Sequence, residues 1–278
     1  MARLLLYTYY SQGSQRFNMF SKIKNSVVAL LAVAGFTMAQ AATVHVKFDS
    51  NIFSGMTGSG YDAVSIYYPG QAQSSAEQSA YVAAGRFQGT ASKLVDVQPS
   101  VFVDGIGNLY MYCYDLYEHI GGNWDVDYTI NYKGPTQRTL NFLGAVDYVL
   151  HGNTNTWTDK FAWVHITDQY LGAAIQLGIW ESKYDTDSNW SLTSGSFKAS
   201  NLDKPTQAWW NLLSAAAANA NVNDLQAQYA MTLEAKGAQD MITGDPQPVP
   251  EPGSLALVGL ALAGFAAVRR RSTPVAQG

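Results

Sequence analysis

Hydrophobic and polar residues alternate along short segments in the first half of the chain, a period of two that is typical of half-buried β-strands. Five segments show this pattern, at residues 43–49, 63–68, 93–98, 100–116 and 125–132. Glycine-rich turns, such as the one at residues 54–61, separate them. The pattern predicts a β-rich sandwich or barrel in the first half.

The second half of the chain spaces its hydrophobic residues three and four apart, which predicts amphipathic helices. The predicted helices cover residues 137–151, 168–182 and 206–220. Gly152 follows the first helix, Thr167 is the candidate N-cap of the second, and Pro205 precedes the third. A shorter helix is expected at residues 75–84. The fold class is therefore predicted to be α+β, with a helical part after the strands.

The N-terminal region has the pattern of a secretory signal peptide. Lys22 and Lys24 precede an apolar run at residues 27–36, and the small residues of Ala-Gln-Ala at 39–41 follow it. Because the residues before this pattern are unusually polar, we expect translation to start at Met19. A buried N-terminal helix is the alternative, and the shortness of the run argues against it.

The C-terminal region contains Pro250, Glu251 and Pro252, then apolar residues 255–268, and then three arginines, Arg269, Arg270 and Arg271. This order resembles the PEP-CTERM sorting signal of Gram-negative bacteria. The resemblance implies transit through the inner membrane, recognition of the Pro-Glu-Pro motif by an exosortase, and removal of the tail. Residues 272–278 extend the tail slightly beyond the expected pattern.

The apolar stretch of this tail is short for a membrane span. Its 14 residues would form a helix of roughly 21 Å, whereas the hydrocarbon core is roughly 30 Å thick. The helix therefore needs flanking residues or crosses the membrane only transiently. The arginines should stay on the cytoplasmic side, which leaves the body of the protein secreted or at the cell surface. A permanent C-terminal anchor without processing is the alternative.

These terminal segments divide the chain into four parts. We expect an N-terminal extension with signal peptide at 1–41, a single-domain body at 42–240, a linker with the Pro-Glu-Pro motif at 241–252, and the sorting helix with its arginine-rich tail at 253–278. Residues 42–250 hold 10 basic and 20 acidic residues, a net charge near −10. Since such a surface does not attract phosphates, nucleic acid is not an expected partner.

The body contains two residues that need an explanation. Cys113 is the only cysteine of a chain expected to leave the cytoplasm, so it cannot form a disulfide within the chain. A free cysteine is often just a small buried hydrophobic residue. Gln176 lies in the middle of the otherwise apolar segment 173–181, where a buried amide requires a hydrogen-bond partner.

Together the two segments resemble the thioester domains of bacterial surface proteins. That family joins a Cys, set between an aromatic residue and a hydrophobic-acidic pair, to a Gln that precedes a hydrophobic-x-hydrophobic-Trp pattern. The matching segments here are Tyr112-Cys113-Tyr114-Asp115 and Gln176-Leu177-Gly178-Ile179-Trp180. Ile175 and Gly178 depart from the usual Thr and Ala. Segments at 83–87 and 192–197 also resemble PEP-CTERM proteins that carry this Cys and Gln pair.

The resemblance implies a reaction between Cys113 and Gln176. The thiolate would attack the side-chain carbonyl, release ammonia and leave an internal thioester. An amine on an unidentified surface or matrix partner would then attack that carbonyl, free the thiol and form a covalent tether. This is single-turnover attachment in adhesion, so we do not expect an enzyme.

Four neighbouring side chains are expected to support the reaction. Tyr112 and Trp180 would exclude water. His119 is a candidate for proton transfer, and Asp115 would orient a proton donor or simply pair with a lysine. His165 is a further candidate for proton transfer. The alternative function is a non-covalent structural protein of a biofilm or exopolysaccharide matrix, with Cys113 free.

Other chemistry is less well supported by the sequence. The four histidines lack zinc-site spacing, and residues 185–189 lack the glycine and closing glutamate of a calcium loop, so neither a metal nor a cofactor is expected. A glycosidase pair of Asp115 or Glu118 with Glu181 is not favoured. Trp209 and Trp210 have helical spacing with Leu212 and Leu213, a pattern more typical of core residues than of a sugar-binding platform.

Overall fold

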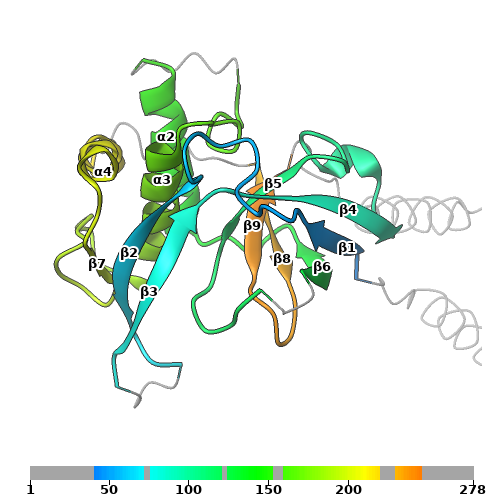
Figure 1. Cartoon of the computed structure of the whole chain (residues 1–278), viewed down its shortest axis with the longest axis horizontal. Helices are drawn as coiled ribbons and strands as arrows, with labels where there is room; N and C mark the ends of the chain where they lie inside the picture. Colours follow the sequence, from blue (N-terminus) through cyan, green and yellow to red (C-terminus); the bar gives the residue numbers. More distant parts are fainter. Residues whose placement is uncertain (1–40, 72–75, 121–123, 153–158, 220–228, 246–278) are drawn as a thin grey trace, which may run out of the picture. The chain divides into compact units, whose positions relative to one another are not determined.

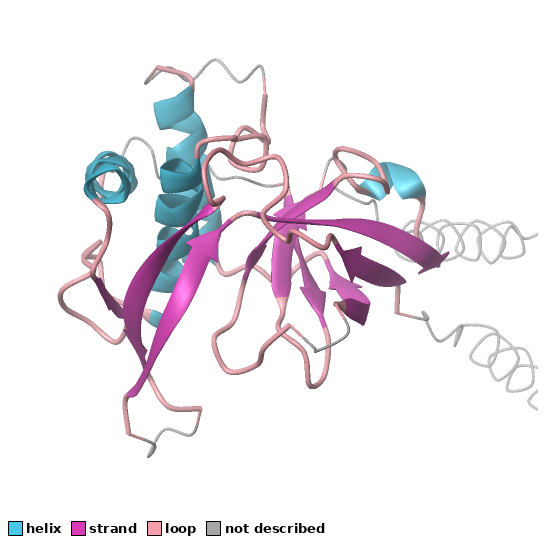
Figure 2. Ribbon diagram, viewed as in Figure 1, coloured by secondary structure: helices cyan, strands magenta, loops and turns pink. Residues whose placement is uncertain are grey.

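The computed structural model describes residues 41–71, 76–120, 124–152, 159–219 and 229–245. In this part of the chain, Figures 1 and 2 show a closed β-barrel and, beside it, a second sheet backed by α-helices. The structure thus confirms the α+β class. The predicted signal peptide and the predicted sorting helix lie outside the described residues.

The barrel has six strands. Their order around it is β1 (Thr43–Phe48), β4 (Phe87–Val95), β5 (Leu109–Cys113), β9 (Met241–Gly244), β8 (Ala230–Glu234) and β6 (Asp125–Asn131), which closes on β1. All neighbours are antiparallel. The alternation in the sequence is explained here, because Val44, Val46 and Phe48 of β1 are buried while the residues between them are more exposed.

The second sheet has three strands in the order β3 (Gln78–Gly85), β2 (Tyr61–Tyr68) and β7 (Lys198–Ser200). Helix α3 (Gln169–Tyr184) contacts both β2 and β3. In Figure 1 these two long strands cross in front of α3. The second sheet therefore packs on α3, and the barrel lies beside this layer (Figure 1).

Helix α3 packs against α2 (Gln137–Leu150) and α4 (Lys204–Ala217) as well as the sheet. Nearly every residue from Leu171 to Ser182 is buried, as expected for a helix that is apolar around its whole circumference. Asp168, and not Thr167 as predicted, is its N-cap, and its carboxylate accepts hydrogen bonds from the backbone N–H groups of Tyr170 and Leu171.

Two predictions of local structure in the first half are wrong. Residues 78–84, predicted as part of a helix, form strand β3, which pairs along its whole length with β2. Their alanines favour a helix, but strand pairing outweighs that preference. The long strand predicted at residues 100–116 is a 3₁₀ turn (Pro99–Val101) and a loop before β5.

The predicted linker also begins too early. Met241–Gly244 is a barrel strand with four buried residues, so the body extends past residue 240. Because β8 and β9 both come from this C-terminal part, the barrel is not confined to the first half of the chain. Among the described residues, no helix has the length and apolar character needed to cross a membrane.

Candidate functional site

Cys113 and Gln176 lie together where strands β4 and β5 of the barrel stop pairing. Cys113 is the last residue of β5, and on one edge it pairs with Met241 of β9. On the other edge, the pairing of β5 with β4 ends at Met111 and Phe87. The backbone N–H and C=O of Cys113 therefore need a partner that β4 does not supply.

The side chain of Gln176 supplies that partner from the middle of α3. Its Oε1 accepts a hydrogen bond from the Cys113 backbone N–H at 2.8 Å, and its Nε2 donates one to the Cys113 carbonyl at 2.8 Å. Gln176 is fully buried and Cys113 is 4% exposed. The two bonds hold the carboxamide against the residue that carries the thiol, and they explain a glutamine in an apolar helix.

The thiol itself lies in a poorly hydrated environment. Burial raises the pKa of Cys113 well above its ordinary value, and the nearby charge of Asp115 raises it further. The thiol is therefore protonated at neutral pH. Any nucleophilic attack by its sulfur requires a neighbouring group that accepts the proton.

Three ionisable side chains are linked to this proton: Asp115 acts on the thiol directly, and Asp240 and Lys183 act on Asp115. Burial raises the pKa of Asp115 to about 6, so its carboxylate titrates near neutral pH. Asp115 Oδ2 accepts a hydrogen bond from the Asp240 backbone N–H at 3.1 Å, and its Oδ1 has no partner among the described residues. Burial also raises the pKa of Asp240. The third is Lys183, whose pKa is lowered by burial and whose Nζ lies 3.9 Å from the Tyr114 ring centroid.

Tyr112 and Trp180 belong to the dry core around the pair. Tyr112 is fully buried, stacks on Trp163 at 5.9 Å between centroids, and donates its hydroxyl to the Trp163 carbonyl. Trp180, one turn after Gln176, is 2% exposed and packs against Phe197. Both positions suit side chains that keep water from the Cys113 region.

The two histidine candidates lie elsewhere. His119 is exposed, and in the described part of the chain its backbone carbonyl accepts from Gln239 while its side chain has no contact with Cys113 or Gln176. The ring nitrogens of His165 lie 3.3 Å from a carboxylate oxygen of Asp104 and 2.8 Å from one of Asp159, on the surface. The structure therefore gives proton transfer to neither histidine.

Sequence reasoning missed Lys183 and Asp240. Lys183 is seven residues after Gln176, and this two-turn spacing on one helix face was a usable signal. Asp240 had no such signal, because its position depends on the β8–β9 hairpin that was not predicted.

The other acidic candidates have structural roles. Glu181 pairs with Arg138 at 3.2 Å, and burial raises its pKa to about 8. Arg138 in turn lies over the Trp190 ring, so the pair fixes the segment after α3. Glu118 accepts from the Gly237 backbone N–H at 3.0 Å. Within the described ranges, no three His, Cys, Asp or Glu side chains are grouped to hold a metal ion.

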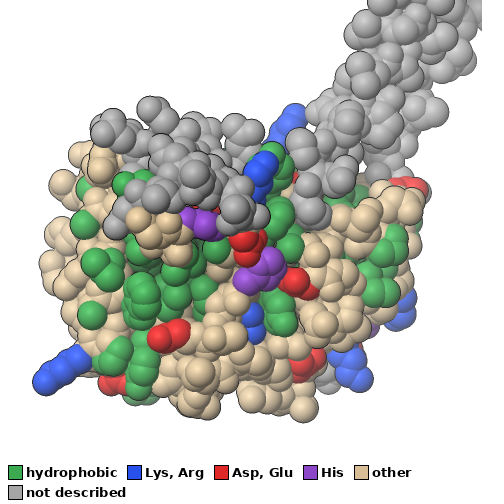
Figure 3. Space-filling model, turned by 90° about the horizontal axis from the view of Figure 1, so that it is seen from above, with side chains coloured by type: hydrophobic (Ala, Val, Ile, Leu, Met, Phe, Trp, Pro, Cys, Tyr) green, Lys and Arg blue, Asp and Glu red, His purple; other side chains and the backbone are tan. Residues whose placement is uncertain are grey.

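The face in Figure 3 has hydrophobic, acidic and histidine side chains, and its Lys and Arg side chains are scattered rather than gathered into a patch. This distribution agrees with the acidic balance of residues 42–250. A phosphate backbone would find no continuous basic surface on this face.

Comparison with known proteins concerns the C-terminal region. The PEP-CTERM protein-sorting motif matches residues 248–271. The PEP-CTERM match includes the Pro-Glu-Pro residues and the three arginines, so this part of the sequence prediction is confirmed. A PEP-CTERM motif implies an exported protein that is processed by exosortase. No curated protein and no solved structure matches the chain, and the resemblance to thioester domains gains no support from these comparisons.

Proposed function

We propose that this exported, exosortase-processed protein acts at the cell surface or in the extracellular matrix, where an internal thioester between Cys113 and Gln176 attaches it to an amine of a partner. The observation that carries the proposal is the pair of 2.8 Å hydrogen bonds between the Gln176 carboxamide and the Cys113 backbone. These bonds hold the carboxamide carbon of Gln176, the electrophile, next to Cys113, whose sulfur is the nucleophile.

The same hydrogen bonds suit the chemistry of attack. The Cys113 N–H polarises the Gln176 carbonyl and would stabilise the negative charge that develops on Oε1. A bond forms between Sγ and the carboxamide carbon, and the bond from that carbon to Nε2 breaks. The thiol proton leaves with Nε2 as part of ammonia, so no other reactant is consumed.

Asp115 is the best-placed proton carrier for this step. Its pKa of about 6 lets it accept the thiol proton and release it again near neutral pH. It follows Cys113 by two residues and has one carboxylate oxygen without a partner among the described residues. Asp115 therefore takes the proton-transfer role for which the sequence offered His119 and His165.

Burial has two consequences for the proposed bond. The dry surroundings protect a thioester from hydrolysis. A partner amine, however, reaches the Gln176 carbonyl only after local opening of the chain around β5 and α3, since both residues are buried. Attachment would then depend on a partner that promotes this opening.

A non-covalent matrix protein is the second candidate, and two observations favour it. The hydrogen bonds of Gln176 satisfy an open strand edge without any reaction. The raised pKa of Cys113 also keeps the thiol in its unreactive form.

Intact mass of the full chain, purified in detergent, separates the candidates. A thioester should lower the mass by about 17 Da as ammonia leaves, and methylamine should then add about 31 Da and expose one thiol. The deficit should vanish in Cys113→Ala and in Gln176→Glu. It should persist in Gln169→Ala, which removes another glutamine of the same helix.

The outcome that overturns the thioester is a full mass together with complete alkylation of Cys113 after unfolding. That result would leave Gln176 as a buried amide that closes the edge of β5, and the protein as a non-covalent component of its matrix.

A further inference from the structure

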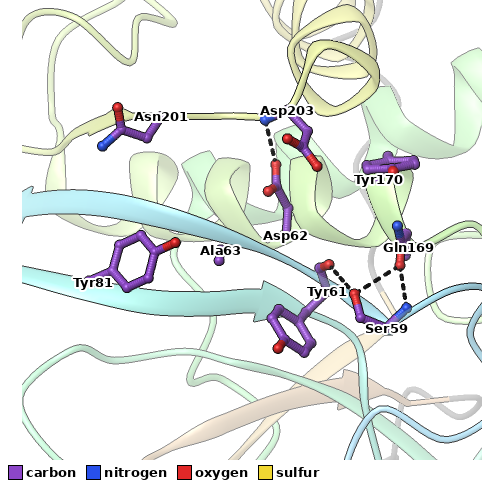
Figure 4. Close-up of a pocket in the computed structure, with 9 residues that line it drawn as sticks. All are labelled: Ser59, Tyr61, Asp62, Ala63, Tyr81, Gln169, Tyr170, Asn201 and Asp203. Carbon is purple, nitrogen blue, oxygen red and sulfur yellow. Dashed lines mark hydrogen bonds between the residues drawn. The ribbon is translucent and has the colours of Figure 1, made fainter.

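A cleft of about 510 Å³ lies at the start of β2, away from Cys113. Its walls come from β2 and β3, from the first turn of α3, and from the segment that leads from β7 into α4 (Figure 4). This volume lies within the usual range for small-molecule sites.

Hydrogen bonds hold the rim of the cleft in place. Gln169 Oε1 accepts from the backbone N–H groups of Ser59 at 2.7 Å and Gly60 at 3.1 Å, which ties the loop before β2 to α3. On the opposite side, Asn201 adopts a left-handed backbone with a φ of 63° and donates its side chain to Ser65 Oγ. These hydrogen bonds within the chain fix the walls of the cleft.

Two carboxylates face this space. Asp62 is 4% exposed, and its Oδ2 accepts from the Asp203 backbone N–H at 2.9 Å. Asp203 is the N-cap residue of α4, yet its carboxylate makes no capping hydrogen bond and remains available to a ligand. Figure 4 shows both carboxylates on the α4 side of β2. The described lining contains no Lys or Arg, so an anionic ligand is disfavoured.

Tyrosine rings complete the lining. The β2–β3 register pairs Tyr61 with Gly85 and Ser65 with Tyr81, which places Tyr61 and Tyr81 on one face on either side of the small Ala63. Tyr81 is 72% exposed, and among the described residues no ring stacks on it, so its face is accessible to a ligand. Tyr170 borders the cleft from α3.

These observations together point to one ligand chemistry. A sugar ring presents an apolar C–H face that packs on an aromatic ring, and hydroxyl groups that donate to carboxylates and exchange hydrogen bonds with amides. We infer that the cleft binds a neutral polysaccharide chain, with Tyr81 against a sugar ring and Asp203 accepting from its hydroxyls.

This inference rests on the cleft and not on the thioester, so it is tested with the covalent chemistry removed. The full chain with Cys113→Ala, in detergent, is run in native gels that contain dextran, galactomannan or barley β-glucan, with alginate as an anionic comparator. At least one neutral polysaccharide should retard it. Tyr81→Ala and Asp203→Asn should each weaken that binding about tenfold, the effect of losing one good contact.

Tyr67→Ala is the matched control, because Tyr67 is a 39% exposed tyrosine of β2 outside the cleft, and its substitution should leave the retardation unchanged. No retardation by any neutral polysaccharide, or equal retardation of the Tyr81→Ala protein, would overturn the inference. Binding of spermidine alone, measured by calorimetry, would also overturn it and identify a cation site.

Discussion

Two glutamines of α3 perform the same local task in opposite surroundings. Gln169 and Gln176 are seven residues apart, so they lie on the same side of the helix, and each accepts hydrogen bonds from backbone N–H groups of another segment. Gln169 does so at the surface beside the cleft, whereas Gln176 does so in the dry core beside a thiol. The two residues are of the same type, so it is the buried position beside a thiol that makes Gln176 a candidate electrophile, whereas Gln169 only links two segments by hydrogen bonds.

The largest expected effect is the difference in stability between two variants, in which Gln176 or Gln169 is replaced by alanine in a Cys113→Ala protein. Gln176→Ala leaves two buried backbone groups without partners as well as a cavity, and should lower the free energy of unfolding by roughly 3 to 5 kcal/mol. Gln169→Ala exposes its partners to water and should cost less than about 1 kcal/mol. Urea unfolding measures both, and equal losses would contradict the contrast.

The next largest effect concerns two glycines of α3, Gly178 and Gly172, each replaced by alanine. A Cβ on Gly178 would lie 1.9 Å from Cζ of Phe142, whose ring is fully buried. Gly178→Ala should therefore lower the free energy of unfolding by about 1 to 3 kcal/mol. A Cβ on Gly172 would meet the flexible end of Met56 at 2.7 Å, and the helix preference of alanine offsets that contact. Thermal unfolding should therefore show a lowered Tm for Gly178→Ala only.

A smaller effect concerns pH. Burial raises the pKa of Asp115 from 3.8 to about 6, so the folded protein holds this proton more tightly than the unfolded chain. The resulting stabilisation is present below about pH 4 and is lost as the pH rises through about 6. A shift of this size corresponds to roughly 3 kcal/mol for a fully buried group. Because solvent screens part of the interaction at Asp115, Asp115→Asn should flatten the decline by about 1 kcal/mol. Unfolding curves between pH 4 and 7 measure it, and an unchanged slope in the variant would refute the assignment.

The smallest effect is expected in the open cleft. Because Tyr81 is mostly exposed, Tyr81→Ala should change the free energy of unfolding by less than about 0.5 kcal/mol. Tyr112→Phe removes the buried hydrogen bond to the Trp163 carbonyl and should cost about 1 kcal/mol. If Tyr81→Ala were the more destabilising of the two, Tyr81 would have a structural role that its exposure does not suggest.

The sequence was informative where periodicity was long or regular. The alternation in β1 and β6 and the helical spacing of α2, α3 and α4 predicted those elements, because a single buried face determines each pattern. Strand β3 was missed because its alanines carry a helix preference that only pairing with β2 overrides. Strands β8 and β9 are too short to show a period.

The candidate site was predictable to a similar extent. One cysteine and one glutamine in apolar surroundings, together with a family resemblance, directed attention to Cys113 and Gln176. Their contact through the Cys113 backbone depends on where β4 leaves β5, which is a tertiary feature with no local sequence pattern. Asp240 and the cleft at Asp203 are absent from the sequence prediction for the same reason.

The position of β9 has a mechanical consequence. The matched PEP-CTERM motif begins at residue 248, four residues after β9 ends at Gly244. Tension applied at that motif would pass almost directly into β9, and from there into β5 through the Met241–Cys113 pair. If a molecule tethered at Gln176 were also held by the chain that follows β9, the load would cross the few hydrogen-bonded pairs between β9 and β5. This short ladder is where we expect a pulled protein to yield first.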